Sequence, residues 1–195
     1  MTTREGKITA IFGCMFASKS STLIGYYQKY QFAKRKCIVI KHAADTRYQD
    51  TPTCEVKSGS SGYIISHDQI KVKADYNVTK LADLDENKEA QSDLESCYAI
   101  IIEEGHFYED CADFAEIWAD KGKHVIIAGL LSGQNREPIP TMSRILSKAE
   151  EVIKLNALCT TCFEPASFTK LRPGFELGVG GAERYTVSCR KCYKI

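Results

Sequence analysis

One segment near the start of the chain has the spacing of a phosphate-binding loop. Residues 13–20 read GCMFASKS, which matches the pattern G-x-x-x-x-G-K-[ST] except that Ser18 replaces the second glycine. In such a loop, backbone N–H groups surround phosphates at the positive end of a helix. Lys19 would reach the outer phosphates, and the Ser20 hydroxyl would ligate Mg²⁺. The segment predicts binding of a nucleoside triphosphate through Gly13, Ser18, Lys19, Ser20 and Ser21.

Ser18 leaves a second interpretation open. Serine is a good helix-capping residue, so the segment could be a simple strand-to-helix turn. A Cβ at this position can also strain a loop that glycine leaves relaxed. The flanking residues favour the phosphate loop, because 7–12 (KITAIF) is typical of a buried strand and 19–35 repeats apolar residues at helical spacing. Strand, loop and helix is the context that such a loop requires.

Two acids follow another apolar run. Residues 98–107 (YAIIIEEGHF) predict a buried strand that ends in Glu103 and Glu104. In open α/β sheets, ligands bind beyond the carboxyl ends of the strands. Neighbouring strand residues point to opposite sides, so one acid could hold magnesium while the other accepts the proton of a reacting hydroxyl. Alone, the pair would more simply be two exposed charges, but beside a phosphate loop it indicates phosphoryl transfer.

Four cysteines near the end of the chain form two C-x-x-C pairs. They are Cys159 with Cys162 and Cys189 with Cys192. Four thiolates suit tetrahedral Zn²⁺, and a site with four protein ligands keeps no position for a reactive water. We therefore predict a structural zinc site that holds both ends of segment 163–188. The alternative is a redox centre of the thioredoxin type, which needs only one such pair.

The rest of the sequence predicts one α/β domain with a small module attached. Short apolar runs alternate with helical patterns, which is typical of a parallel sheet covered by helices on both faces. Besides the segments above, these runs and patterns are 36–41, 114–122 and 124–131. After Ile153 the sequence changes to cysteine pairs, short β-type runs and the glycine-rich segment 177–184. We place the boundary near Asn156, between a nucleotide-binding domain (1–155) and a zinc-binding module (156–195).

Composition and charge exclude several classes of protein. The 195 residues are 44% hydrophobic and 26% charged, with a formal net charge of +1, as in ordinary globular proteins. Such a balance argues against a nucleic-acid surface, and the apolar run at 7–12 is too short for a signal peptide or membrane span. We expect a cytoplasmic protein that binds neither nucleic acid nor membranes. The remaining cysteines are expected to be free thiols, namely Cys14, Cys37, Cys54, Cys97 and Cys111.

Together these segments resemble the zinc-containing thymidine kinase family over nearly the whole chain. The matching segments are GCMFASKSS, the tetrapeptide DTRY at 45–48 within a polar stretch expected to be a surface loop (44–61), IIEEGHF, and the ending VGGAERYTVSCRKCY. The resemblance implies a P-loop NTPase-like fold with a zinc-ribbon or lasso module. It implies transfer of the ATP γ-phosphoryl group to the 5′-hydroxyl of deoxythymidine, giving dTMP, by a homotetramer or homodimer.

The resemblance also implies roles for individual residues. Glu104 would be the base that deprotonates the nucleoside 5′-hydroxyl, and Glu103 stands where the family keeps a magnesium-associated aspartate. Lys19 and Arg47 would lie near the phosphates. Residues expected to line the nucleoside pocket are Met15, Phe107, Thr169, Val179, Gly180, Gly181 and Tyr185.

The chain departs from the family pattern at several positions. Ser18 and Glu103 stand in place of glycine and aspartate. In segment 129–138 (GLLSGQNREP), Leu131 and Gln134 replace an aspartate and a pocket phenylalanine. These changes affect metal binding, base stacking and turnover together. They leave an alternative open, in which the chain is a catalytically weakened paralogue that binds nucleotide and acts as a regulatory or structural subunit.

Overall fold

A six-stranded parallel sheet forms the core of the molecule, in the strand order β5-β2-β6-β7-β1-β8. The computed structural model describes residues 5–45, 62–65, 69–176 and 180–193. The strands are β1 (Lys7–Gly13), β2 (Cys37–His42), β5 (Tyr76–Val78), β6 (Ala99–Ile102), β7 (His124–Gly129) and β8 (Glu151–Leu155). β1, β2, β6 and β7 are buried along almost their whole length, which explains their continuous apolar sequences.

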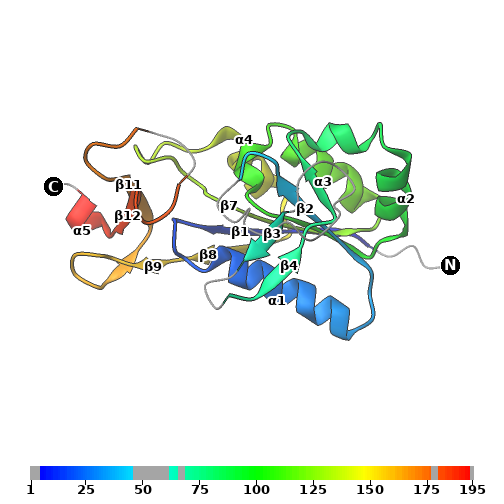
Figure 1. Ribbon diagram of the computed structural model, residues 1–195, viewed down its shortest axis with the longest axis horizontal. Helices are drawn as coiled ribbons and strands as arrows, with labels where there is room; N and C mark the ends of the chain where they lie inside the picture. The colour runs from blue at the N-terminus through cyan, green and yellow to red at the C-terminus, as the bar shows by residue number, and fades with distance from the viewer. Residues whose placement is uncertain (1–4, 46–61, 66–68, 177–179, 194–195) are drawn as a thin grey trace.

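Helices cover both faces of this sheet (Figure 1). One face carries α1 (Lys19–Phe32), and the other carries α2 (Lys88–Ser96), α3 (Cys111–Asp120) and α4 (Pro140–Lys148). Neighbouring residues of β6 enter opposite layers, since Ile100 packs in the cluster that contains Trp118 and Ile101 in the cluster that contains Leu23. The predicted α/β fold with helices on both faces is therefore confirmed.

Shorter elements complete the fold. An antiparallel hairpin of β3 (Tyr63–Ile65) and β4 (Lys71–Lys73) contacts α1 through β3, and two 3₁₀ helices, η1 (Leu81–Leu84) and η2 (Gly105–Phe107), lie on the side of α3 and α4. At one end of the molecule, two small antiparallel pairs and a short helix follow the sheet (Figure 1). They are β9 (Ala157–Leu158), β10 (Pro165–Ala166), β11 (Phe168–Leu171), β12 (Tyr185–Ser188) and α5 (Arg190–Tyr193).

Two details differ from the sequence-based expectation. α1 ends at Phe32 rather than at residue 35, because Lys34 adopts a left-handed conformation (φ 54°) that stops the helix. The β6 strand ends at Ile102, before the two acids. Within the described ranges, no helix combines the length and the apolar character needed to cross a membrane.

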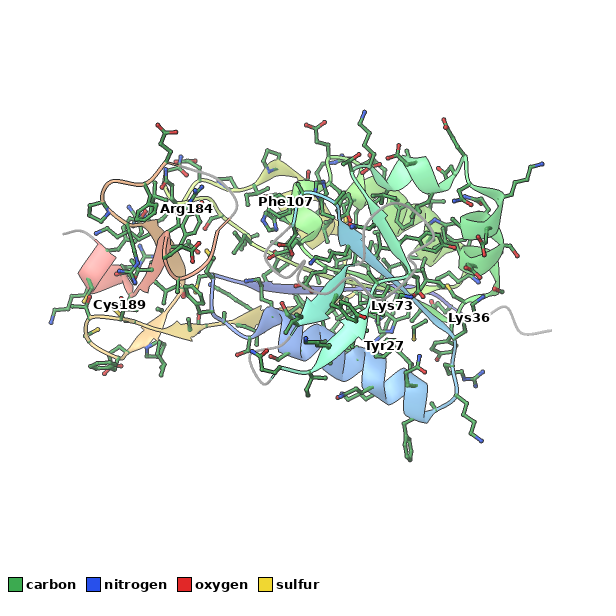
Figure 2. The ribbon with its side chains drawn as sticks, viewed as in Figure 1. Tyr27, Lys36, Lys73, Phe107, Arg184 and Cys189 are labelled. Atoms are coloured by element: carbon green, nitrogen blue, oxygen red, sulfur yellow. The ribbon has the colours of Figure 1, made fainter. Side chains whose placement is uncertain are left out.

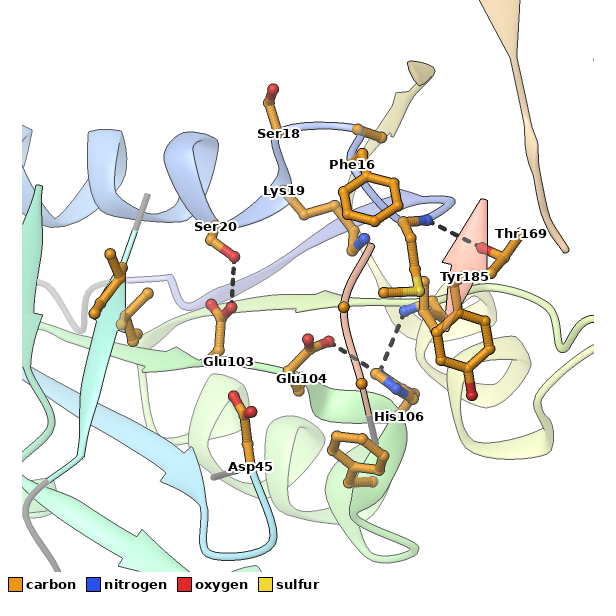
Figure 3. Close-up of a pocket in the computed structure, with 18 of the residues that line it drawn as sticks. Phe16, Ser18, Lys19, Ser20, Asp45, Glu103, Glu104, His106, Thr169 and Tyr185 are labelled. Carbon is orange, nitrogen blue, oxygen red and sulfur yellow. Dashed lines mark hydrogen bonds and ion pairs between the residues drawn. The ribbon is translucent and has the colours of Figure 1, made fainter. Parts of the chain in front are cut away.

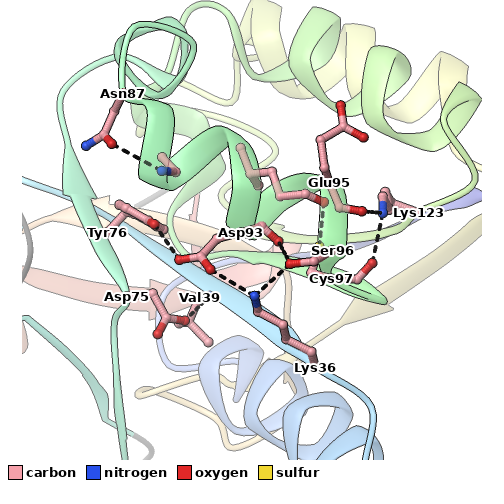
Figure 4. A network of polar contacts seen from close by, with 12 residues as sticks. Lys36, Val39, Asp75, Tyr76, Asn87, Asp93, Glu95, Ser96, Cys97 and Lys123 are labelled. Atoms are coloured by element: carbon pink, nitrogen blue, oxygen red, sulfur yellow. Dashed lines mark hydrogen bonds and ion pairs between the residues drawn. The ribbon is translucent and has the colours of Figure 1, made fainter.

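A polar network anchors α2 to the sheet (Figure 4). The Nζ atom of Lys36, just before β2, donates to Asp93 Oδ1 at 2.8 Å and to Ser96 Oγ at 2.7 Å. The other carboxylate oxygen of Asp93 accepts from the hydroxyl of Tyr76 on β5 at 2.7 Å. Burial and this carboxylate raise the pKa of the Tyr76 hydroxyl, so it stays protonated and donates across the whole physiological range.

We predict that Tyr76→Phe lowers the free energy of unfolding by about 1–2 kcal/mol, because it removes a buried hydrogen bond to a carboxylate and keeps the ring. Urea denaturation measures this change. Tyr27→Phe is the matched control, since the Tyr27 hydroxyl on α1 donates no hydrogen bond to any residue that the structure describes. Its effect should stay within about 0.5 kcal/mol. If both variants lose the same free energy of unfolding, the hydrogen bond of Tyr76 to Asp93 does not stabilise the fold.

Candidate active site

A cavity of about 600 Å³ opens beyond the carboxyl ends of the strands, between the loop after β1 and the C-terminal module (Figure 3). Most predicted site residues line it: Met15, Ser18, Lys19, Ser20, Ser21, Glu103, Glu104, Phe107, Thr169, Gly180, Gly181 and Tyr185. Gly13 lies at the base of the loop, outside the lining. Arg47 and Val179 lie outside the described residues, as does most of the predicted 44–61 loop.

The loop after β1 depends on close backbone packing. A Cβ atom at Gly13 would lie 2.9 Å from the Cβ of Ala17 and 3.0 Å from the carbonyl oxygen of Leu155, so only glycine fits there. Phe16 and Ser18 both adopt left-handed conformations, with φ of 61° and 58°, and turn the chain into α1. Ser18 occupies the N-cap position, but its side chain makes no capping hydrogen bond. The capping interpretation of this serine is therefore wrong.

Lys19 and Ser20 begin α1 with their side chains directed into the site (Figure 3). The Nζ atom of Lys19 donates to the carbonyl oxygen of Cys14 at 2.8 Å, which holds the ammonium group against the loop. The Ser20 hydroxyl donates to Glu103 Oε1 at 2.6 Å. This bond joins the start of α1 to the end of β6, so the two predicted motifs form one site.

The two acids do not point to opposite sides, as alternation along a strand would require. Glu103 follows β6, and its N–H still donates to the carbonyl oxygen of Ile40 at 3.0 Å. Glu104 then adopts φ 52°, a left-handed conformation that reverses the direction of the chain. A Cβ at Gly105 would lie 2.4 Å from Cγ2 of Ile127, which makes glycine necessary in this turn. Both carboxylates therefore face the same cavity, and the two residues are only 5% and 9% exposed.

Asp45 and His106 are polar groups of the cavity that sequence reasoning missed. Asp45, 4% exposed, lines the cavity and forms a buried ion pair with Lys41 at 3.4 Å. Nδ1 of His106 lies 3.3 Å from Oε2 of Glu104 and 3.4 Å from the backbone nitrogen of Leu130, so it either donates to the carboxylate or accepts the Leu130 N–H. Asp45 begins the DTRY segment and His106 follows the two acids in EEGHF. The resemblance of these two segments to the family was the signal that could have identified both residues. Three buried carboxylates thus gather around one cavity (Figure 3).

The C-terminal module supplies the opposite wall. Thr169 on β11 accepts the N–H of Met15 through its Oγ1 atom at 3.0 Å, which connects the module directly to the loop after β1. Tyr185 on β12 lies beside it and is 7% exposed. Phe107, from η2, packs against His106 with ring centroids 4.2 Å apart. An aromatic and aliphatic compartment therefore adjoins the phosphate loop and the acids.

The four paired cysteines meet in one cluster outside the cavity. Their sulfur atoms all lie within 4.8 Å of one another, with 3.6 Å between those of Cys162 and Cys189. Tetrahedral zinc with bonds of about 2.3 Å would separate sulfurs by roughly 3.8 Å, so the cluster fits zinc. Backbone N–H groups, foremost that of Cys189, lower the pKa of Cys159, whereas hydrogen bonds with Cys162 and Cys189 raise the pKa of Cys192. Cys189 lies in the module at the end of the molecule, far from Phe107 (Figure 2).

The gathering of all four sulfurs supports the zinc interpretation over separate redox pairs. All eight cysteines in the described ranges are free thiols. Four of them, Cys14, Cys37, Cys97 and Cys111, are buried, as expected for scattered structural thiols, and Cys54 lies outside those ranges.

Comparison with known proteins finds similarity along almost the full chain. The family model described as thymidine kinase matches residues 6–193. The chain is 38% identical over 192 residues to the thymidine kinase of raccoon poxvirus, covering 96% of this chain and 97% of the viral protein. It is 36% identical over 191 residues to thymidine kinase 1 of Dictyostelium discoideum, covering 96% and 78% of the two chains. It is 37% identical over 192 residues to the cytosolic thymidine kinase of Homo sapiens, covering 97% and 74%.

We predict that Ser18→Gly raises the free energy of unfolding by about 1 kcal/mol, because glycine adopts the left-handed conformation without the steric penalty of a Cβ. Chemical denaturation is the measurement. The neighbouring variant Ala17→Gly should change stability in the opposite direction, since it removes a buried methyl group from a residue outside the left-handed region. A loss of stability in Ser18→Gly would show that the serine side chain stabilises the loop.

Proposed function

The chain belongs to the thymidine kinase family, and we propose that it transfers the γ-phosphoryl group of ATP to the 5′-hydroxyl of thymidine. One observation carries this conclusion. Lys19, Ser20, Glu103 and Glu104 converge on a single cavity whose opposite wall comes from the C-terminal module. Phosphoryl transfer needs mainly positioned reactants and neutralised charge, and these groups supply both.

The phosphate loop would bind the ATP phosphates. Backbone N–H groups of residues 18–21 at the start of α1 face a site where the helix dipole favours negative charge. Lys19 would exchange its bond to the Cys14 carbonyl for phosphate oxygens, because a charged acceptor forms the stronger hydrogen bond. Arg47, outside the described residues, is part of this proposal through the family resemblance alone.

Ser20 and Glu103 would hold Mg²⁺. A hydroxyl and a carboxylate are the hard oxygen ligands that this ion prefers, and the two side chains already lie 2.6 Å apart. When bound, the ion neutralises charge on the β- and γ-phosphates. Burial of Glu103 beside Ser20 supports this assignment, because a carboxylate withdrawn from water is stabilised by a nearby cation.

Glu104 would remove the proton from the nucleoside 5′-hydroxyl. Its left-handed backbone aims the carboxylate into the cavity beside Glu103. The nucleoside hydroxyl, held by Glu104, would therefore lie next to the Mg²⁺ held by Glu103 and the ATP phosphates. When Nδ1 of His106, 3.3 Å away, carries a proton, it would donate to this carboxylate and hold it in one orientation. A base held within reach of the hydroxyl is the geometric requirement for general-base catalysis.

The nucleoside would occupy the compartment between η2 and the C-terminal module. Its walls are mainly apolar and aromatic, and Gly180 and Gly181 form part of them. The N–H of Gly181 donates to Glu183 Oε1 at 2.6 Å, so a base would have to replace that bond to use this group. The residues proposed to contact it are Met15, Phe107, Thr169, Gly180, Gly181 and Tyr185, together with Val179 outside the described residues.

Two departures from the family pattern, Ser18 and Glu103, are compatible with an active enzyme. Ser18 maintains the left-handed turn that leads into α1, and Glu103 bonds Ser20 directly. The described site therefore retains an amine, a hydroxyl and two buried carboxylates in one cavity. This arrangement favours the kinase over the alternative of an idle nucleotide-binding subunit.

The proposal also covers the division into domains, the oligomeric state and the cellular location of the protein. The last strand of the large sheet, β8, ends at Leu155, which supports a division into a nucleotide-binding domain (1–155) and a zinc-binding module (156–195). Family membership supports a homotetramer or homodimer. Similarity to relatives named cytosolic thymidine kinase supports a cytoplasmic location.

We predict that the protein phosphorylates thymidine with ATP and that Glu104→Gln lowers kcat by roughly 10²–10⁴-fold, because the amide cannot accept the proton. Initial rates with each of the four deoxynucleosides test the function, and calorimetry with ATP tests that donor binding stays intact. Glu103→Gln is the matched control: it should instead raise the Mg²⁺ concentration needed for half-maximal rate. Full activity of Glu104→Gln at saturating ATP would rule out this base.

We predict one zinc ion per chain and its loss in Cys192→Ser, because a hydroxyl is a poor zinc ligand. Since metal binding contributes to folding of such modules, the variant should also become more sensitive to proteolysis after residue 156. Elemental analysis of protein purified without added metal gives the zinc content. Cys37→Ser, which changes a buried thiol outside the cluster, should keep a full equivalent. Less than half an equivalent of any transition metal in the unmodified protein would refute the site.

A further inference from the structure

A tight turn at residues 132–138 forms part of the cavity wall. Ser132 and Pro138 pair as an antiparallel bridge, and the N–H of Gly133 donates to the carbonyl oxygen of Glu137 at 3.0 Å. Arg136 adopts a left-handed conformation (φ 66°), and its N–H donates to the carbonyl oxygen of Gly133 at 3.1 Å. Ser132, Gly133 and Gln134 line the cavity. The first half of this turn therefore faces the ligand space, whereas Arg136 extends from its second half.

Side chains of the C-terminal module hold the turn from outside. The hydroxyl of Tyr193 donates to the carbonyl oxygen of Gln134. The guanidinium carbon of Arg136 lies 4.7 Å from the centre of the Tyr193 ring and 5.6 Å from that of Phe168. The two rings pack edge to face with centroids 5.5 Å apart. One hydrogen bond and one cation between two aromatic faces thus connect the turn to the module.

The position of Tyr193 depends on the cysteine cluster. Tyr193 ends α5, a helix of only four residues, which is far too short to be stable by itself. Its N–H donates to the carbonyl oxygen of Cys189 at 3.0 Å, and the N–H of Cys192 donates to the sulfur of Cys189 at 3.5 Å. The helix is therefore held in place by the residues that form the cluster.

Phe168 adjoins a second hydrogen bond between the module and the main domain, that of Thr169. It precedes Thr169, which binds the N–H of Met15 in the phosphate loop, and it pairs with Ser188 on β12. Two further cations surround the rings, with Arg190 5.2 Å from Phe168 and Lys170 5.8 Å from Tyr193. Three neighbouring cations repel one another, and the negative faces of the rings offset this repulsion.

We propose that Arg136 and Tyr193 are positioning residues that clamp the 132–138 turn onto the cysteine module and thereby fix one wall of the nucleoside compartment. The identity of the ligand rests on the proposed function, but the clamp itself does not. Lys19, Ser20 and the two acids are carried by α1 and the segment after β6, so none of them belongs to the turn. Loosening the clamp should therefore weaken nucleoside binding and leave ATP binding and the chemical step unchanged.

The kinetic test uses the full-length protein and Tyr193→Phe, which removes the hydroxyl but keeps the ring. We expect the KM for thymidine to rise about fivefold, the effect of one net hydrogen bond, with kcat and the KM for ATP within about twofold. Arg136→Lys keeps the charge but loses the planar stacking group, and it should shift the same constant in the same direction. Lys191→Ala, at an exposed residue of the same short helix, is the matched control and should change none of these constants.

A second measurement requires no activity. The N–H groups of Gly133, Arg136 and Ile139 are hydrogen bonded within or beside the turn, so hydrogen–deuterium exchange of a peptide spanning 130–139 reports its stability. In Tyr193→Phe and Arg136→Lys, exchange of this peptide should accelerate about fivefold, while exchange of the phosphate loop at 13–20 stays unchanged.

The two measurements separate this inference from the proposed function. If exchange accelerates in the two variants but the unmodified protein does not phosphorylate thymidine, the clamp is supported and the proposed function is refuted. Unchanged exchange in both variants would overturn the clamp, whatever the activity. Accelerated exchange with an unchanged KM for thymidine would overturn its role in nucleoside binding. If the KM for ATP rises as much as the KM for thymidine, the turn affects both ligands, and its proposed selective role in nucleoside binding is overturned.

Discussion

Parallel pairing of β1 with both β7 and β8 is the constraint on which the rest of the structure depends. Phe12 is in register with Gly129, and Gly13 with Leu155. Because parallel strands end at the same edge of a sheet, this pairing brings three chain segments together: the phosphate loop, the turn that follows β7, and the start of the C-terminal module. A Cβ at Gly13 would meet the Leu155 carbonyl, so the pairing also explains why glycine begins the phosphate loop.

Burial of charge gives the cavity its chemical character. Asp45, Glu103 and Glu104 are each at most 9% exposed, and removing carboxylates from water is unfavourable unless cations or hydrogen bonds compensate. Lys41 compensates Asp45 through a buried ion pair, and Ser20 donates to Glu103. Low solvent exposure strengthens every electrostatic interaction inside such a cavity, which suits a reaction that transfers a highly charged group.

The small C-terminal module closes this site by an apolar cluster with the phosphate loop and by specific hydrogen bonds. Thr169 binds the backbone of the phosphate loop, and Tyr193 binds the turn at 132–138. So small a unit offers little apolar surface to bury, and its four-cysteine cluster fits the zinc cross-link that stabilises such units. Through Tyr193 the four-cysteine cluster is thus connected to one wall of the cavity, although none of its cysteines lines the cavity.

The sequence alone determined the features that depend on neighbouring residues. The phosphate loop between a strand and a helix, the two cysteine pairs and the alternation of strands and helices are all local patterns, and each is found in the structure. Tertiary structure decided where the acids point: Glu104 makes a left-handed turn, and Ile127 on another strand leaves no room for a side chain at the next residue, Gly105. It also decided that Asp45, His106 and the 132–138 turn belong to the site. Their positions follow from packing between segments far apart in the chain, and spacing along a sequence carries no record of such contacts.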